Sequence, residues 1–93
     1  MTTPVVHNAD ACRFEVRVEG GVAQCCYSRS GSVLVLHHTE VPAALRGQGV
    51  AAELVAATLD WAREQRLRVR PVCSYVAVYM RRHPQTLDLL ETR

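Results

Sequence analysis

The chain has 93 residues, of which 48% are apolar and 22% are charged, and its formal net charge is +2. This composition suits one small globular domain over residues 1–93 and argues against a disordered chain. We expect no nucleic-acid partner because the net charge is small, and no membrane partner because the apolar runs are too short to cross a bilayer. All eleven basic residues are arginines, so no lysine side chain is available for acetylation.

The four cysteines favour reduced thiols over two disulfides. They are Cys12, Cys25, Cys26 and Cys73, and their spacing matches no zinc-binding pattern, so we expect no metal site. The first residues lack the basic and apolar regions of a secretory signal. We therefore expect a cytoplasmic location.

The first half of the chain predicts an antiparallel meander of three strands. Residues 1–11 show no period and predict a loose start. From Cys12 to Glu19 apolar residues alternate with Arg13, Glu15 and Arg17, which predicts a strand with one buried and one wet face. Gly20-Gly21 predicts a tight hairpin, because both positions tolerate positive φ.

Two further strands follow this hairpin. We expect the second over residues 22–27, a turn over 28–32 and the third over 33–39. The run Val33-Leu34-Val35-Leu36 indicates that the third strand is buried on both faces. Pro42 cannot donate to a sheet ladder, so it ends or edges that strand.

The second half of the chain predicts helix, strand and helix. Apolar positions at helical spacing run from Val50 to about Arg66. A fourth strand over 67–72 follows, and Ser74 is a plausible N-cap for a helix through about Arg82. The tail through Leu90 has enough apolar surface to dock as one more helical turn. The crossover makes strand four parallel to strand three, so the fold class is α+β with a mixed sheet.

A short glycine loop separates the third strand from the long helix. The loop covers Leu45 to Ala51, and at such a place free backbone N–H groups converge in front of the positive end of the helix dipole. Gly47 and Gly49 lack a Cβ, so a ligand can approach the backbone closely. This pattern predicts a phosphate-binding loop, and the alternative is an empty turn into a helix.

The loop sequence Arg46-Gly47-Gln48-Gly49-Val50-Ala51 resembles the Gln/Arg-x-x-Gly-x-Gly/Ala signature of the GNAT superfamily of N-acetyltransferases. A wider set of segments, 38–42, 45–51, 72–77 and 82–84, resembles the short, stand-alone YjdJ-like acetyltransferases. The resemblance spans about Phe14 to Leu89. It implies a minimal GNAT fold that uses acetyl-CoA as its acetyl-donor cosubstrate.

The resemblance also implies where acetyl-CoA binds. The pantetheine arm would lie in a V-shaped gap between the strands ending at Val41 and Val72, hydrogen-bonded to the backbone around Thr39 to Val41. The pyrophosphate would sit on backbone N–H groups of the loop, with Arg46 adding charge. The implied cofactor-binding residues are Thr39, Val41, Arg46, Gly47, Gln48, Gly49, Val50 and Ala51.

Acetyl transfer to an amine needs a way to remove a proton, a donor for the oxyanion and a proton for the leaving thiolate. Tyr79 occupies a place where many members of the superfamily carry a tyrosine that protonates the coenzyme A sulfur, although it could simply pack its ring on the core. Cys73 precedes a helix, whose dipole favours the thiolate. It could take the acetyl group first, or it could be a small buried residue near the cofactor.

Glu40 is the third catalytic candidate. Alternation places His38 and Glu40 on one face of the strand and His37 and Thr39 on the other. Glu40 could act as a general base, directly or through water, or be a solvated or ion-paired strand residue. The two adjacent histidines predict a metal site only if other ligands converge, and the spacing offers none.

The chain departs from ordinary GNAT proteins in its length. Those proteins carry a helical pair between the first two strands, where this chain has the Gly20-Gly21 hairpin, so we expect an open acceptor groove or one completed by a second subunit. We expect an N-acetyltransferase that moves acetyl to an amine of a small molecule, peptide or protein. The alternative is an acetyl-CoA- or CoA-binding module with little catalysis that acts as a sensor or interaction domain. The pattern is compatible with a monomer or a weak homodimer.

Overall fold

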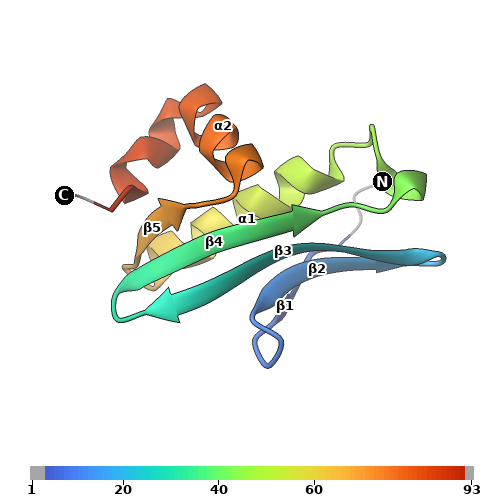
Figure 1. Cartoon of the computed structure of the whole chain (residues 1–93), viewed down its shortest axis with the longest axis horizontal. Coiled ribbons are helices and arrows are strands. Elements are labelled where there is room, and N and C mark those ends of the chain that lie inside the picture. The colour runs from blue at the N-terminus through green and yellow to red at the C-terminus, as the bar shows by residue number, and fades with distance from the viewer. Residues whose placement is uncertain (1–3, 92–93) are drawn as a thin grey trace.

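The computed structural model describes residues 4–91, which form a five-stranded sheet in the order β1-β2-β3-β4-β5 (Figure 1). Strands β1 to β4 are antiparallel, and β5 is parallel to β4. The fold class expected from the sequence is therefore confirmed. In chain order the elements are β1 (Val6–Asn8), β2 (Arg13–Val18), β3 (Gly21–Ser30), β4 (Val33–Glu40), the 3₁₀ turn η1 (Ala43–Leu45), α1 (Val50–Glu64), β5 (Arg68–Pro71), α2 (Ser74–Arg82) and the 3₁₀ segment η2 (Pro84–Leu89).

The N-terminal segment corrects the expectation of a loose start. Val6–Asn8 pairs with β2, and the His7 ring stacks on Phe14 with centroids 4.1 Å apart. Nε2 of His7 also lies 2.6 Å from the Tyr27 hydroxyl. A strand of only three residues is too short for its alternation to be recognised in the sequence. The prediction for residues 1–3 lies outside the described residues.

Alternating residues of the strands form one side of the core, and α1 packs against them. Val18 pairs with Gly21, which confirms the tight hairpin. A Cβ on Gly21 would lie 2.9 Å from Cγ of Pro42, so the start of β3 closely approaches Pro42, two residues after the end of β4. Strand β3 extends to Ser30, and only residues 31 and 32 turn, with Gly31 at φ +60°.

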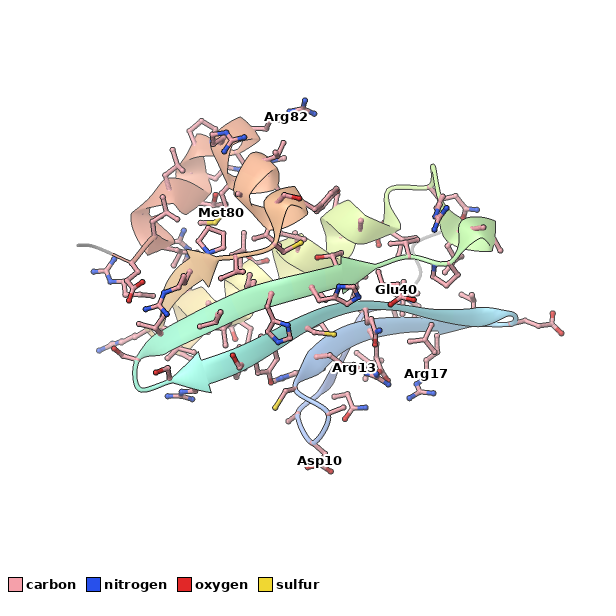
Figure 2. All side chains as sticks on the ribbon, viewed as in Figure 1. Asp10, Arg13, Arg17, Glu40, Met80 and Arg82 are labelled. Carbon is pink, nitrogen blue, oxygen red and sulfur yellow. The ribbon has the colours of Figure 1, made fainter. Side chains whose placement is uncertain are left out.

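The opposite face of the sheet carries polar side chains (Figure 2). Glu15 was expected to be solvated there, but its side chain is only 3% exposed because two arginines cover it. Nε of Arg13 and Nε of Arg17 each lie 2.7 Å from one of its carboxylate oxygens. The Arg17 hydrogen bond is the largest effect on the pKa of Glu15 and, with Arg13, lowers it although burial opposes the shift.

An irregularity in β4 changes which side chains face the core. Tyr27 pairs with Leu36 and Cys26 pairs with His38, so His37 has no partner on β3 and forms a bulge. Before the bulge, Leu34 and Leu36 are buried, whereas Val33 and Val35 are only half-buried, which corrects the prediction of burial on both faces. After the bulge the alternation is reversed, so that Thr39, opposite buried Cys25, lies on the core face of the sheet.

The second half of the chain follows the predicted order, with shifted boundaries. Helix α1 ends at Glu64 rather than near Arg66, because Arg66 adopts φ +59° and the Leu67 amide donates to the Ala62 carbonyl. The N-cap of α2 is Cys73, not Ser74. Leu89 is buried, which confirms that the tail docks on the core. Among residues 4–91 no helix is long and apolar enough to span a membrane.

Replacement of Glu15 by Gln should lower the melting temperature, since two arginines would lose their carboxylate. The pKa of Glu15 is lowered in the folded chain, so its stabilising contribution is present above the pKa of an unfolded glutamate and is lost as pH falls through the folded value. Thermal unfolding across an acid pH series should show the difference between parent and variant shrinking. Glu19→Gln, at an exposed hairpin position, is the control; an equal effect in both variants would contradict this role.

Candidate cofactor and active site

A gap opens where β4 continues past the end of β5. The parallel pairing ends at Leu36 and Pro71, and the Cys73 amide then donates to the Leu36 carbonyl at 2.9 Å. Beyond that contact the chain turns into α2, while β4 runs on to Glu40 with β3 on its other side. No other strand of the described chain, 4–91, pairs with this edge of β4.

Cys73 and Thr39 meet at the closed end of this gap. Sγ of Cys73 lies 3.6 Å from Oγ1 of Thr39. Burial alone would raise the pKa of the Cys73 thiol, but hydrogen bonds from the Thr39 hydroxyl and from the backbone amides of Val76, Tyr75 and Thr39 outweigh it and lower the pKa. Cys73 is the N-cap of α2, and the surroundings of its sulfur favour the thiolate.

The other cysteines lack this environment. All four thiols are free. Burial raises the pKa of Cys25 and of Cys26, which lie on opposite sides of β3. Cys12 lies in the exposed turn between β1 and β2. Cys73 is thus the cysteine whose position and acidity suit chemistry in the gap.

The glycine loop lies between η1 and α1, beyond the end of β4. Gly47 has φ +82° and Gly49, the N-cap of α1, has φ +77°, so the loop turns twice through the left-handed region that favours glycine. The first amides of α1 have no intrahelical acceptor, and no side chain within residues 4–91 caps them. A Cβ on either glycine would meet nothing within 4 Å, so the space in front of the loop is open.

Arg46 and Gln48 hold the loop against the preceding segment. Nε of Arg46 donates to the Val41 carbonyl at 3.0 Å, and the Gln48 amide donates to the Ala44 carbonyl at 3.2 Å. The Arg46 contact leaves its terminal guanidinium nitrogens available to a ligand. It also occupies the Val41 carbonyl, so Val41 can contribute to a ligand site through its amide or its side chain.

A pocket of about 240 Å³ brings most of the predicted cofactor-binding residues together. Thr39 and Gln48 are not part of its wall. Tyr75, at the start of α2, is a lining residue that the sequence analysis missed, and only its place two residues after Cys73 could have suggested it. The lining residues are Val41, Leu45, Arg46, Gly47, Gly49, Val50, Ala51, Ala52 and Tyr75.

Glu40 lies on the polar face of the sheet rather than in this pocket (Figure 2). Nε2 of His38 lies 3.1 Å from Oε1 of Glu40, and the amide of Gln24 lies 3.5 Å from the same oxygen. The His38 contact is the largest cause of a lowered pKa at Glu40. A carboxylate with a lowered pKa is a weak proton acceptor at neutral pH but a lasting negative charge.

Tyr79 lies on the side of α2 that faces α1. Its ring stacks on His83 with centroids 3.9 Å apart, and both line a second pocket of about 130 Å³. Burial raises the pKa of Tyr79, and the nearby Asp60 raises it further. Cys73 and Thr39 contact each other at the end of β4, and neither lines this second pocket.

The fold is that of a GCN5-like N-acetyltransferase. It superposes with a TM-score of 0.77 on the NMR solution structure of a GCN5-like putative N-acetyltransferase from Staphylococcus aureus, at 21% identity, covering 98% of this chain and 90% of that one. A family model described as GCN5-related N-acetyl-transferase matches residues 13–89. The chain is also 37% identical to Protein NATD1 of Mus musculus over 92 residues, covering 94% of this chain and 84% of the mouse protein.

The human Protein NATD1 shows the same 37% identity, with 94% of this chain and 81% of the human protein covered. The chain therefore belongs to the GCN5-related N-acetyltransferase family, and the resemblance seen in its glycine loop is confirmed.

Cys73 should react with iodoacetamide at lower pH than Cys26, because its pKa is lowered and that of Cys26 is raised. Peptide mass spectrometry over a pH series measures each rate separately. Thr39→Val removes the hydroxyl beside the sulfur and should move the Cys73 profile to higher pH. An unchanged profile in that variant would show that Thr39 does not influence the thiol.

Proposed function

We propose that this chain is an acetyl-CoA-dependent N-acetyltransferase acting on an amine. The observation that carries the proposal is the open edge of β4, which has Cys73 and Thr39 at one end and the glycine loop at the other. An extended ligand with an anionic centre matches that arrangement. The pantetheine arm would pair with the β4 edge as a strand does, and the pyrophosphate would accept hydrogen bonds from the loop amides.

In the proposed reaction Cys73 takes the acetyl group first. Its thiolate attacks the thioester carbonyl, a new S–C bond forms, and the C–S bond to coenzyme A breaks and releases that sulfur as a thiolate. In this step the Thr39 amide and hydroxyl, which contact the Cys73 sulfur, would donate hydrogen bonds to the oxyanion. An acceptor amine that has lost its ammonium proton to solvent then attacks the acetyl-cysteine. The C–S bond to Cys73 breaks, a second proton passes from the new amide to solvent, and the Cys73 thiolate is restored.

Glu40 has a different role in this proposal. Its lowered pKa makes it poorly suited to remove a proton, but its charge on the open face of the sheet attracts a cationic amine toward the gap. The short hairpin between β2 and β3 leaves that face without a wall of helices, which suits an acceptor presented on a peptide or protein. Four free thiols fit a reducing compartment, and we propose the cytoplasm.

Intact-mass spectrometry after incubation with acetyl-CoA tests the covalent step. The parent should gain an acetyl group that Cys73→Ala lacks, while Cys12→Ala, at an exposed cysteine, keeps it. Since the chain has no lysine, an adduct cannot be confused with acetylation of a side-chain amine. Full turnover in Cys73→Ala would instead establish direct attack of the amine on acetyl-CoA.

Thermal shift distinguishes the remaining possibilities, because a ligand that binds the native state raises the melting temperature. A shift with acetyl-CoA but no transfer to any of a panel of amines and peptides would favour a CoA-binding module. No shift would overturn the acetyl-CoA proposal.

Gly49→Ala should weaken acetyl-CoA binding about tenfold, the size of one lost charge-assisted hydrogen bond. The new Cβ projects into the open space before the loop, and a positive φ strains any other residue there. Gly31→Ala is a matched control, because Gly31 also has positive φ and open surroundings but lies in the β3–β4 turn. Calorimetric titration of both variants should show a loss of affinity in the first alone; equal losses would mean that strain, not the loop, is responsible.

A further inference from the structure

The second pocket adjoins the first. Ala52 and Tyr75 line both, so the two pockets meet at the first turns of α1 and α2. At about 240 Å³ and 130 Å³, each is smaller than the pockets of roughly 300–1,000 Å³ that enclose whole drug-sized ligands. Two small adjoining pockets suit separate parts of one elongated ligand.

Three of the six residues that line the second pocket carry rings: Tyr75, Tyr79 and His83. The Tyr79 and His83 rings are nearly parallel, 15° apart, and Nδ1 of His83 lies 2.8 Å from the Tyr79 carbonyl. A carbonyl only accepts, so Nδ1 carries the proton and the histidine ring is held in place. Tyr75, at the boundary between the pockets, is 41% exposed, which is unusual for a large apolar ring. Such rings offer faces on which a planar heterocycle can stack.

Arg82 supplies a positive charge at the same pocket. It is an exposed residue in the last turn of α2, and Figure 2 shows its side chain extending away from the helix. Within residues 4–91 its guanidinium forms no ion pair, whereas four other arginines are paired with carboxylates. The neighbouring Arg81 is also exposed but does not line the pocket.

We propose that the second pocket binds the nucleotide end of acetyl-CoA, with the adenine base against the rings of Tyr75 and Tyr79 and the ribose 3′-phosphate paired with Arg82. This inference rests on the proposed function. It assigns the Tyr79 ring to binding rather than its hydroxyl to proton transfer.

The connectivity of the ligand supports this assignment. In coenzyme A the pyrophosphate links the pantetheine arm to the adenosine. If the arm runs from the glycine loop along β4 toward Cys73, the adenosine has to leave the loop on another side. The second pocket borders the first at Ala52, in the first turn of α1. It offers aromatic faces and the guanidinium of Arg82, which has no ion-pair partner among residues 4–91.

Calorimetric titration with coenzyme A and with 3′-dephospho-coenzyme A tests the inference. The parent should bind coenzyme A about tenfold more tightly, the size of one charge-assisted hydrogen bond. Arg82→Ala should bind both ligands equally, at about the affinity of the parent for the dephosphorylated form. Arg81→Ala, which removes the neighbouring charge, should keep the parent's preference.

The outcomes separate this inference from the proposed function. Tight binding of both ligands by the parent without preference would overturn the Arg82 assignment and leave the acetyl-CoA proposal standing, as would a preference that survives in Arg82→Ala. Failure of the parent to bind either ligand would overturn both. Tyr79→Ala, which removes the ring, should weaken the binding of both ligands alike, and undiminished affinity in this variant would overturn the assignment of the Tyr79 ring.

Discussion

The unequal lengths of β4 and β5 are the constraint on which the site depends. β5 ends at Pro71, which has no backbone N–H with which to continue the ladder, while β4 is held by β3 as far as Glu40. The chain leaves β5 directly into α2, with Cys73 as the N-cap. The bulge at His37 turns Thr39 toward the same place. Together these features create an unpaired strand edge with a thiol and a hydroxyl at its end.

The two faces of the sheet serve different purposes. One face packs on α1 and supports the gap and the glycine loop. The other is polar, and its side chains are linked by hydrogen bonds and ion pairs across three strands, from β2 to β4. The network connects buried Glu15 with Glu40, the carboxylate that we place near the acceptor. Its members, in order, are Arg17, Glu15, Arg13, Gln24, Glu40 and His38.

The elements that could be predicted from the sequence are those with a clear hydrophobic period and with glycine or proline at their ends. Alternation and the paired glycines predicted the hairpin, and the glycine loop before a long apolar stripe predicted the start of α1. What it could not predict depends on contacts between distant residues. Glu15 has the alternation of a solvated residue, and only the folded arrangement shows that arginines enclose it. The one-residue bulge at His37 cannot be recognised from the sequence pattern of β4. It nevertheless turns Thr39 toward Cys73. The pocket beside Tyr79 exists only because two helices meet there.

The central claim is that acetyl-CoA lies along the β4 edge and on the glycine loop. An amide-resolved NMR titration of the parent with acetyl-CoA tests it most directly, because each backbone N–H reports its own surroundings. The account predicts the largest shifts at Thr39, at Gly47 to Ala51 and at Cys73, with little change in the β2–β3 hairpin. Shifts confined to the polar face of the sheet, or no shifts at saturating acetyl-CoA, would contradict it.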